Sequence, residues 1–172
     1  MPEKRNLSTA MPIPPPPYVG LYGSHSGDWR DEVAGIFEAE GVAFYDPTDP
    51  RWKGIDEKNG DEKQELIDLL VAEQHKALNG AACVVFHLAR WETRNGVTDK
   101  AREKPALAAR CEIGFLAGRG IRTFVHVEPD VEGRNYLWAQ IALYPHTEKC
   151  DSLESAVHSA IAFVKEAKAA GG

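Results

Sequence analysis

Three features are scarce or absent in this sequence of 172 residues, and each absence excludes a class of protein. Positive charge is in deficit, because 20 lysines and arginines stand against 26 aspartates and glutamates, so nothing favours binding to a long nucleic acid backbone. The three cysteines, Cys83, Cys111 and Cys150, are odd in number and widely spaced, which argues against a disulfide framework and fits a reducing compartment. No apolar run of about 18 residues predicts a membrane span, and no signal-peptide core opens the chain. We therefore expect a cytoplasmic protein.

Metal chemistry also finds little support in the sequence. His25 and His75 with Asp46 and Asp49 supply the right atoms, but no pair among them has the close spacing of a metal-binding motif. We expect no metal and no cofactor. Cys83 and Cys111 are interpreted as small buried hydrophobic residues.

The composition, with 43% hydrophobic and 27% charged residues, is that of one globular domain. Residues 1–17 end in four consecutive prolines, which join neither a helix nor a sheet, so we predict a disordered proline-rich tail. The domain itself is expected to span 18–169.

Hydrophobic periodicity divides this domain into alternating strands and helices. Strands are predicted at 18–22, 42–45, 81–88 and 121–127. Helices are predicted at 28–40, 61–78, from Pro105 to about 118, 135–143 and 152–168. The polar stretches 51–60 and 89–104 are expected to be loops. The second helix is given a core stripe of Leu66, Ile67, Leu70 and Val71, and Asp151 with Glu154 is expected to form a capping box for the last.

This alternation predicts an α/β protein with a parallel sheet and helices on both faces. Residues 81–88 form a continuous apolar run, as expected of a central strand buried on both sides. In such sheets ligands bind at the carboxyl ends of the strands. That rule selects the loop Gly23, Ser24, His25, Ser26 and Gly27, then Asp46, and then the helix that contains Glu112.

Each of these segments has an ordinary structural interpretation beside the functional one. A small-residue turn before a helix can bind an anion through backbone N–H groups, yet such turns are also common structural features. Glu112 lies at the edge of the apolar face of its helix, where a glutamate is usually a solvated charge. Gly114 is unusual, because glycine within a helix costs about 1 kcal/mol relative to alanine, and it can be tolerated where another group must approach closely.

The order of the motifs resembles the nucleoside 2-deoxyribosyltransferase-like family from about Tyr18 to about Ala167. The matching residues are the Gly23-Ser24 turn, Asp28-Trp29-Arg30-Asp31-Glu32-Val33, Tyr45-Asp46-Pro47, Glu73-Gln74-His75-Lys76-Ala77-Leu78 before the apolar run, and Glu112-Ile113-Gly114. The resemblance implies a flavodoxin-like sheet of about five parallel strands and assembly as a homodimer or larger homo-oligomer.

The resemblance also implies cleavage of an N-glycosidic bond through a covalent intermediate on a glutamate, which is Glu112 here. Tyr22 would orient Glu112, residues 23–27 would hold the sugar or its 5′-phosphate, and Asp46 and His75 would contact or protonate the base. The family's tyrosine before the first glycine is replaced by Gly20, and Tyr22 lies on the same side of the strand.

Two departures from the family pattern leave other functions open. His75 and Cys83 stand where the family carries aspartates. They motivate the alternative of a non-catalytic nucleotide-binding module, and a third reading is cleavage of the nicotinamide–ribose bond of NAD. The base, the sugar and the acceptor are not determined by the sequence.

Overall fold

A parallel sheet of five strands, in the order β2-β1-β3-β4-β5, forms the centre of the molecule. The computed structural model describes residues 11–24, 29–89, 107–129, 131 and 133–170. The strands are β1 (Val19–Gly23), β2 (Phe44–Tyr45), β3 (Cys83–Leu88), β4 (Thr123–Val127) and β5 (Thr147–Lys149). This order is that of flavodoxin-like proteins, and it confirms the predicted α/β fold.

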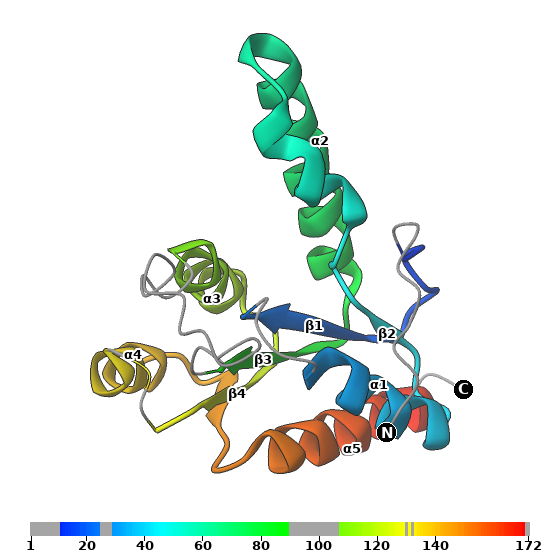
Figure 1. Cartoon of the computed structure of the whole chain (residues 1–172). Helices are drawn as coiled ribbons and strands as arrows, with labels where there is room; N and C mark the ends of the chain where they lie inside the picture. Colours follow the sequence, from blue (N-terminus) through cyan, green and yellow to red (C-terminus); the bar gives the residue numbers. More distant parts are fainter. Residues whose placement is uncertain (1–10, 25–28, 90–106, 130, 132, 171–172) are drawn as a thin grey trace.

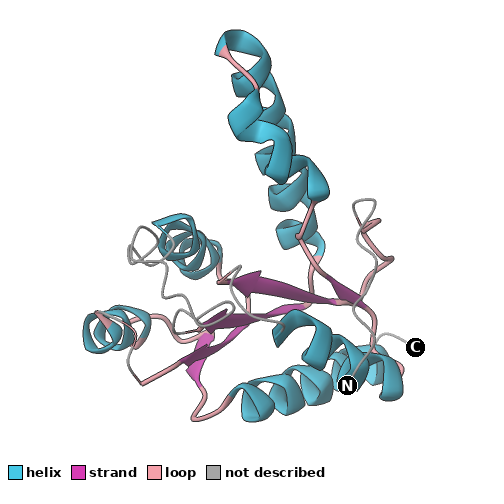
Figure 2. Ribbon diagram, in the orientation of Figure 1, coloured by secondary structure: helices cyan, strands magenta, loops and turns pink. Residues whose placement is uncertain are grey.

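Helices cover both faces of the sheet. They are α1 (Trp29–Ala39), the 3-10 helix η1 (Pro50–Glu57), α2 (Gly60–Gly80), α3 (Leu107–Arg119), α4 (Arg134–Ile141) and α5 (Leu153–Ala170). Helices α1 and α5 lie on one face, and α2, α3 and α4 lie on the other (Figures 1 and 2). Of the helices in the described part of the chain, none is long and apolar enough to cross a membrane.

The two faces of the sheet carry two separate cores. Alternate residues of the central strand β3 divide between them: Cys83 and Val85 pack toward α1 and α5, and Val84 and Phe86 pack toward α2, α3 and α4. Because both faces are covered, the strand has no polar side, which explains the continuous apolar run in the sequence.

Two elements differ from the sequence-based prediction. Residues 50–57 form η1 rather than a loop, because the Asp49 carboxylate accepts a hydrogen bond from the Arg51 amide (2.8 Å) and Pro50 supplies a helical φ at the first position. Strand β5 was not predicted, since its three residues, Thr147–Lys149, are polar and half-exposed at the sheet edge. It forms by pairing with β4.

Helix α2 also differs from its prediction. Of the expected core stripe, only Leu70 is buried; Leu66 and Ile67 are half-buried, and Val71 is 39% exposed. The first turns of α2 extend away from the sheet, and only its C-terminal end lies against the strands (Figure 1). Tyr18 directly precedes β1. Its hydroxyl donates a hydrogen bond to the Ala77 carbonyl (2.6 Å), which fixes the C-terminal end of α2.

The cap of α5 is formed by a different pair from the one predicted. The Ser152 hydroxyl accepts from the Ser155 amide (3.0 Å), and the Ser155 hydroxyl accepts from the Ser152 amide (3.2 Å). The reciprocal geometry is that of a capping box, shifted by one residue from Asp151 and Glu154.

The segment before the first strand is described from Met11 onward. Residues 11–17 form neither helix nor strand, and Met11 is half-buried against the core beneath α1 and α5. Residues 1–10 of the predicted tail lie outside the described residues.

Candidate active site

Glu112, in the second turn of α3, lies at the carboxyl end of the sheet. Its carboxyl group lies close to the backbone of Gly23 at the end of β1. The side chain is half-buried, and burial raises the pKa of Glu112 from 4.5 to about 7, against the lowering effects of Arg30 and of the Gly23 amide. Near neutral pH the carboxyl group is therefore poised between its protonated and ionised forms.

The turn after β1 is joined closely to the end of β3. Gly23 has a φ of +116°, and a Cβ atom there would lie 2.0 Å from the His87 carbonyl oxygen, so the position requires glycine. The Ser24 amide donates to that same carbonyl (2.8 Å), and the Ala89 amide donates to the Ser24 hydroxyl oxygen (3.1 Å). The amide of Ser24 is thus engaged within the protein.

The rest of the predicted anion-binding loop falls outside what the structure describes. His25, Ser26 and Gly27 belong to the residues 25–28 that are not described, so their contribution to a sugar or phosphate site stays a prediction.

Arg30, at the start of α1, is a site residue that the sequence reasoning missed. Its guanidinium is buried and donates to the carbonyls of Ser24 (2.6 Å) and Gly23 (3.3 Å), and its Nε lies 3.4 Å from Asp46 Oδ1. The one available signal was its place in the first turn of the helix that follows the loop. Asp46 therefore lies beside Arg30, and its Oδ1 also accepts from the Thr48 amide (2.9 Å).

Tyr22 is near enough to Glu112 for the two groups to interact electrostatically, and its role in orienting Glu112 stays a prediction. Its ring occupies the space over Gly20, where a Cβ atom would come within 3.0 Å of the tyrosine ring. Its hydroxyl donates to the Gln74 carbonyl on α2 (3.1 Å). Burial, with smaller contributions from Tyr45 and Glu112, raises the pKa of Tyr22 far above its ordinary value, so it stays a neutral phenol.

A cavity of about 530 Å³ opens between α2, α3 and η1, with Glu112 in its wall. The remaining lining residues are Trp52, Val71, Gln74, His75, Leu78, Cys111 and Phe115. The His75 ring stacks on the Phe115 ring with centroids 4.5 Å apart. Cys111 is exposed, which corrects the expectation that it is buried like Cys83.

Trp52 is held in position by ion pairs of Arg51, the clamp between η1 and α2. The Arg51 guanidinium binds the Asp49 carboxylate (2.6 Å) at the start of η1 and the Glu73 carboxylate on α2. This clamp holds η1 against α2 and so brings Trp52 to the cavity that also contains Glu112.

Two further sequence-based expectations concerned Cys83 and Gly114. Cys83 lies on the face of the sheet opposite α3, where its thiol contacts the Ala160 carbonyl of α5 (3.8 Å), so it does not line the cavity. Among the described residues, apart from its own helix backbone and chain neighbours, nothing lies within 4 Å of the place where a Gly114 Cβ atom would sit, so no close approach there accounts for the glycine.

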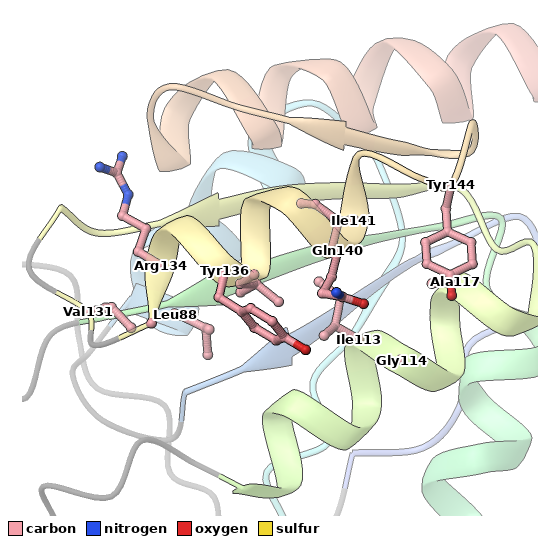
Figure 3. Close-up of a pocket in the computed structure, with 12 residues that line it drawn as sticks. Leu88, Ile113, Gly114, Ala117, Val131, Arg134, Tyr136, Gln140, Ile141 and Tyr144 are labelled. Carbon is pink, nitrogen blue, oxygen red and sulfur yellow. The ribbon is translucent and has the colours of Figure 1, made fainter.

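A second cavity, of about 200 Å³, lies on the other flank of α3, between α3 and α4 (Figure 3). Its walls are mostly apolar, from Leu88, Ile113 and Ile141, and the Arg134 guanidinium points away from it. Of the described residues that line it, none carries a carboxylate, imidazole, thiol or serine hydroxyl. The cavity beside Glu112 is therefore the candidate active site.

Within the described part of the chain, no three histidine, cysteine or acidic residues are grouped so that they could bind a metal ion. Comparison of the chain with protein-family models and with curated proteins gives no match.

Proposed function

We propose that this protein cleaves or transfers at the N-glycosidic bond of a nucleoside or nucleoside 5′-monophosphate, with Glu112 as the nucleophile. The observation that supports this most directly is the position of Glu112. A half-buried carboxyl group close to the backbone at the end of β1 faces a cavity with aromatic walls. This arrangement suits attack on a sugar carbon beside an aromatic base.

The proposed reaction has two displacement steps. In the first, a Glu112 carboxylate oxygen bonds to the anomeric carbon, the N-glycosidic electron pair passes to the base, and the base takes up a proton from His75 or from water. In the second, water or another base bonds to the same carbon and releases a proton, and the ester electron pair returns to Glu112. Two inversions retain the configuration of the sugar.

The aromatic walls of the cavity are suited to an aromatic base. Trp52 comes from η1, and the stacked His75 and Phe115 rings come from α2 and α3. Among the described residues, the indole N–H of Trp52 is buried without a hydrogen-bond partner, and an acceptor atom of the base is the partner that we propose for it. A histidine at position 75 can also carry the proton that the leaving base requires.

The assembly that the resemblance implies belongs to this proposal. Helix α2 exposes Leu69 (48%) and Val71 (39%), and Val71 also lines the cavity. We propose that a second copy of the chain covers this flank of α2 in a homodimer or larger oligomer. Light scattering at low and high protein concentration measures the oligomeric state of the wild type and of Leu69→Asp, which should weaken the association. A wild-type protein that is a monomer at every concentration would refute the proposed assembly.

The experiment that tests the function is base release measured by chromatography. The wild-type protein is incubated with ribonucleosides, deoxyribonucleosides, their 5′-monophosphates and NAD. We expect release from at least one nucleoside or nucleoside monophosphate, lowered by several orders of magnitude in Glu112→Gln and unchanged in Glu38→Gln, which alters an exposed glutamate of α1.

The other outcomes decide against the proposal. Release from NAD alone favours the glycohydrolase alternative. Binding of a nucleotide with no release by the wild-type protein favours a binding module, and release at the wild-type rate by Glu112→Gln removes the role of Glu112.

A further inference from the structure

Two walls of the cavity beside Glu112 are joined through residues that directly neighbour its lining residues. On α2, Glu73 is close in sequence to His75, which lines the cavity. On η1, Arg51 is adjacent to Trp52, which lines it as well. The Arg51 guanidinium binds the Glu73 carboxylate (2.5 Å). One ion pair therefore ties the η1 wall of the cavity to the α2 wall.

The α2 wall is anchored to the sheet independently of this ion pair. The Tyr22 hydroxyl donates to the Gln74 carbonyl (3.1 Å), and further along the helix the Tyr18 hydroxyl donates to the Ala77 carbonyl (2.6 Å). Both tyrosine side chains are almost fully buried. Because dissolved salt has little effect on buried polar contacts, this wall should stay in place when the ion pair is broken.

The η1 wall is attached to α2 by an ion pair that solvent can reach. The Arg51 and Glu73 side chains are 37% and 44% exposed, so water and dissolved ions weaken their attraction. The guanidinium itself is fixed to η1, because its Nε and Nη2 donate to the buried Asp49 carboxylate (3.0 and 2.6 Å). The bond from Arg51 to Glu73 can therefore break while Arg51 stays bound to Asp49.

We propose that the Arg51–Glu73 ion pair opens and closes the cavity, with η1 carrying Trp52 away from the α2 wall or against it. The inference rests on the proposed function, in which the cavity binds the base. In the closed arrangement Trp52 contacts the base, and in the open one the base enters or leaves. Arg51 and Glu73 are positioning residues that determine how tightly the base binds, and they take no part in the chemistry at Glu112.

The indole of Trp52 supports a wall that moves. The side chain is half-buried, and its N–H is enclosed without a hydrogen-bond partner among the described residues. An enclosed donor without a partner costs free energy. In the empty protein this donor therefore opposes the closed arrangement that the ion pair supports. Opening returns the N–H to water, and a bound base supplies an acceptor to the closed arrangement.

The test follows the exposure of Trp52 and needs no substrate. Acrylamide quenching of fluorescence is measured for the wild type and for Trp52→Phe, and the difference gives the contribution of Trp52 among the four tryptophans. Raising NaCl from about 0.05 M to about 1 M, where the Debye length is about 3 Å, should increase the Trp52 quenching constant at least about 1.5-fold. In Glu73→Gln the constant should already be high at low salt and respond little to more salt.

Glu40→Gln is the matched control. It removes an exposed ion pair with Lys165 that joins the chain after α1 to α5, on the other face of the sheet. Its Trp52 quenching and salt response should equal those of the wild type. The salt series on the wild-type protein tests the inference without any substitution, so the result does not depend on the folding of Glu73→Gln.

Kinetics supply a second readout with any nucleoside or nucleoside monophosphate that the wild type turns over. Glu73→Gln should raise KM at least about threefold and leave kcat within about twofold, because the ion pair acts on binding of the base and not on the chemical step. A fall in kcat with KM unchanged would contradict the inference.

The inference also fails if salt leaves the Trp52 quenching constant of the wild type unchanged, or if Glu73→Gln is quenched and responds to salt as the wild type does. An ion pair that only stabilises the fold would lower the thermal midpoint of Glu73→Gln and leave Trp52 quenching unchanged. Absence of base release by the wild-type protein would instead overturn the proposed function and leave the quenching result standing.

Discussion

Replacement of Glu112 by glutamine should make the folded protein more stable at alkaline pH. The folded-state pKa of about 7 lies above the value of 4.5 in a solvated chain, because burial disfavours the charged form. The folded state therefore binds the Glu112 proton more tightly than the unfolded state does. The stability that this proton supplies is fully present below pH 4.5 and is lost as the pH rises through about 7. Glutamine cannot ionise and avoids that loss.

The size of this effect on the free energy of unfolding follows from the difference between the folded-state and unfolded-state pKa values of Glu112. A difference of roughly 2.5 pKa units at about 1.4 kcal/mol each gives at most about 3.5 kcal/mol, and solvent screening of the exposed part of the side chain reduces this to about 2 kcal/mol. Glutamine has nearly the same shape as glutamate and keeps a carbonyl oxygen beside the Gly23 backbone. At pH 5 the two proteins should therefore differ little, and at pH 8 Glu112→Gln should be the more stable.

Urea unfolding at pH 5 and pH 8 measures this difference, with Glu38→Gln as the control. Glu38 is exposed on α1, and its replacement should change the free energy of unfolding by less than about 0.5 kcal/mol at either pH. A stability difference between wild type and Glu112→Gln that does not change with pH would refute the argument. It would mean that Glu112 is an ordinary solvated helix charge.

Three other substitutions or reagents test the geometry around the site. Gly23→Ala should lower the free energy of unfolding by more than about 3 kcal/mol, because its Cβ atom would overlap the His87 carbonyl; a thermal midpoint within about 2 °C of wild type would contradict this. Gly114→Ala should raise stability by about 0.5–1 kcal/mol, since open space surrounds the new methyl group, and a lower midpoint would show a contact there. An aromatic disulfide reagent should modify Cys111 quickly and the two buried cysteines slowly; a fast phase that survives in Cys111→Ser would be inconsistent with the structure.

The sequence predicts the order of most strands and helices because burial gives each of these elements a regular spacing of apolar residues. The apolar run of β3 reflects a strand covered on both faces, and the apolar positions of α1 reflect a helix with one covered side. Where burial is partial, that relation weakens. The apolar residues expected to face the core on α2 do have helical spacing. Most of them lie in the part of the helix that extends away from the sheet. Strand β5 exists only through its pairing with β4.

The candidate site was only partly predictable, for a related reason. Glu112 was identified by resemblance, and Tyr22 by the alternation of β1. Arg30 could not be singled out, because its role depends on two backbone carbonyls whose direction no sequence pattern records. Trp52 is one of four tryptophans in the sequence, and its pattern does not show which of them reaches the cavity; the ion pairs of Arg51 join η1, which carries Trp52, to α2.

The close packing of Gly20 against Tyr22 has a consequence for how this protein can vary. A Cβ atom at position 20 would lie 3.0 Å from the Tyr22 ring and 3.3 Å from a Val84 methyl group, so both neighbours would have to shift to accommodate it. Removal of the ring alone would leave an empty space over the glycine and remove the hydrogen bond to the Gln74 carbonyl of α2. We therefore expect substitutions at the two positions to be coupled, because a side chain at 20 is accommodated more easily when residue 22 is small. A hydroxyl at this edge of the site should move along β1 most readily by a paired exchange, which single-substitution libraries do not sample.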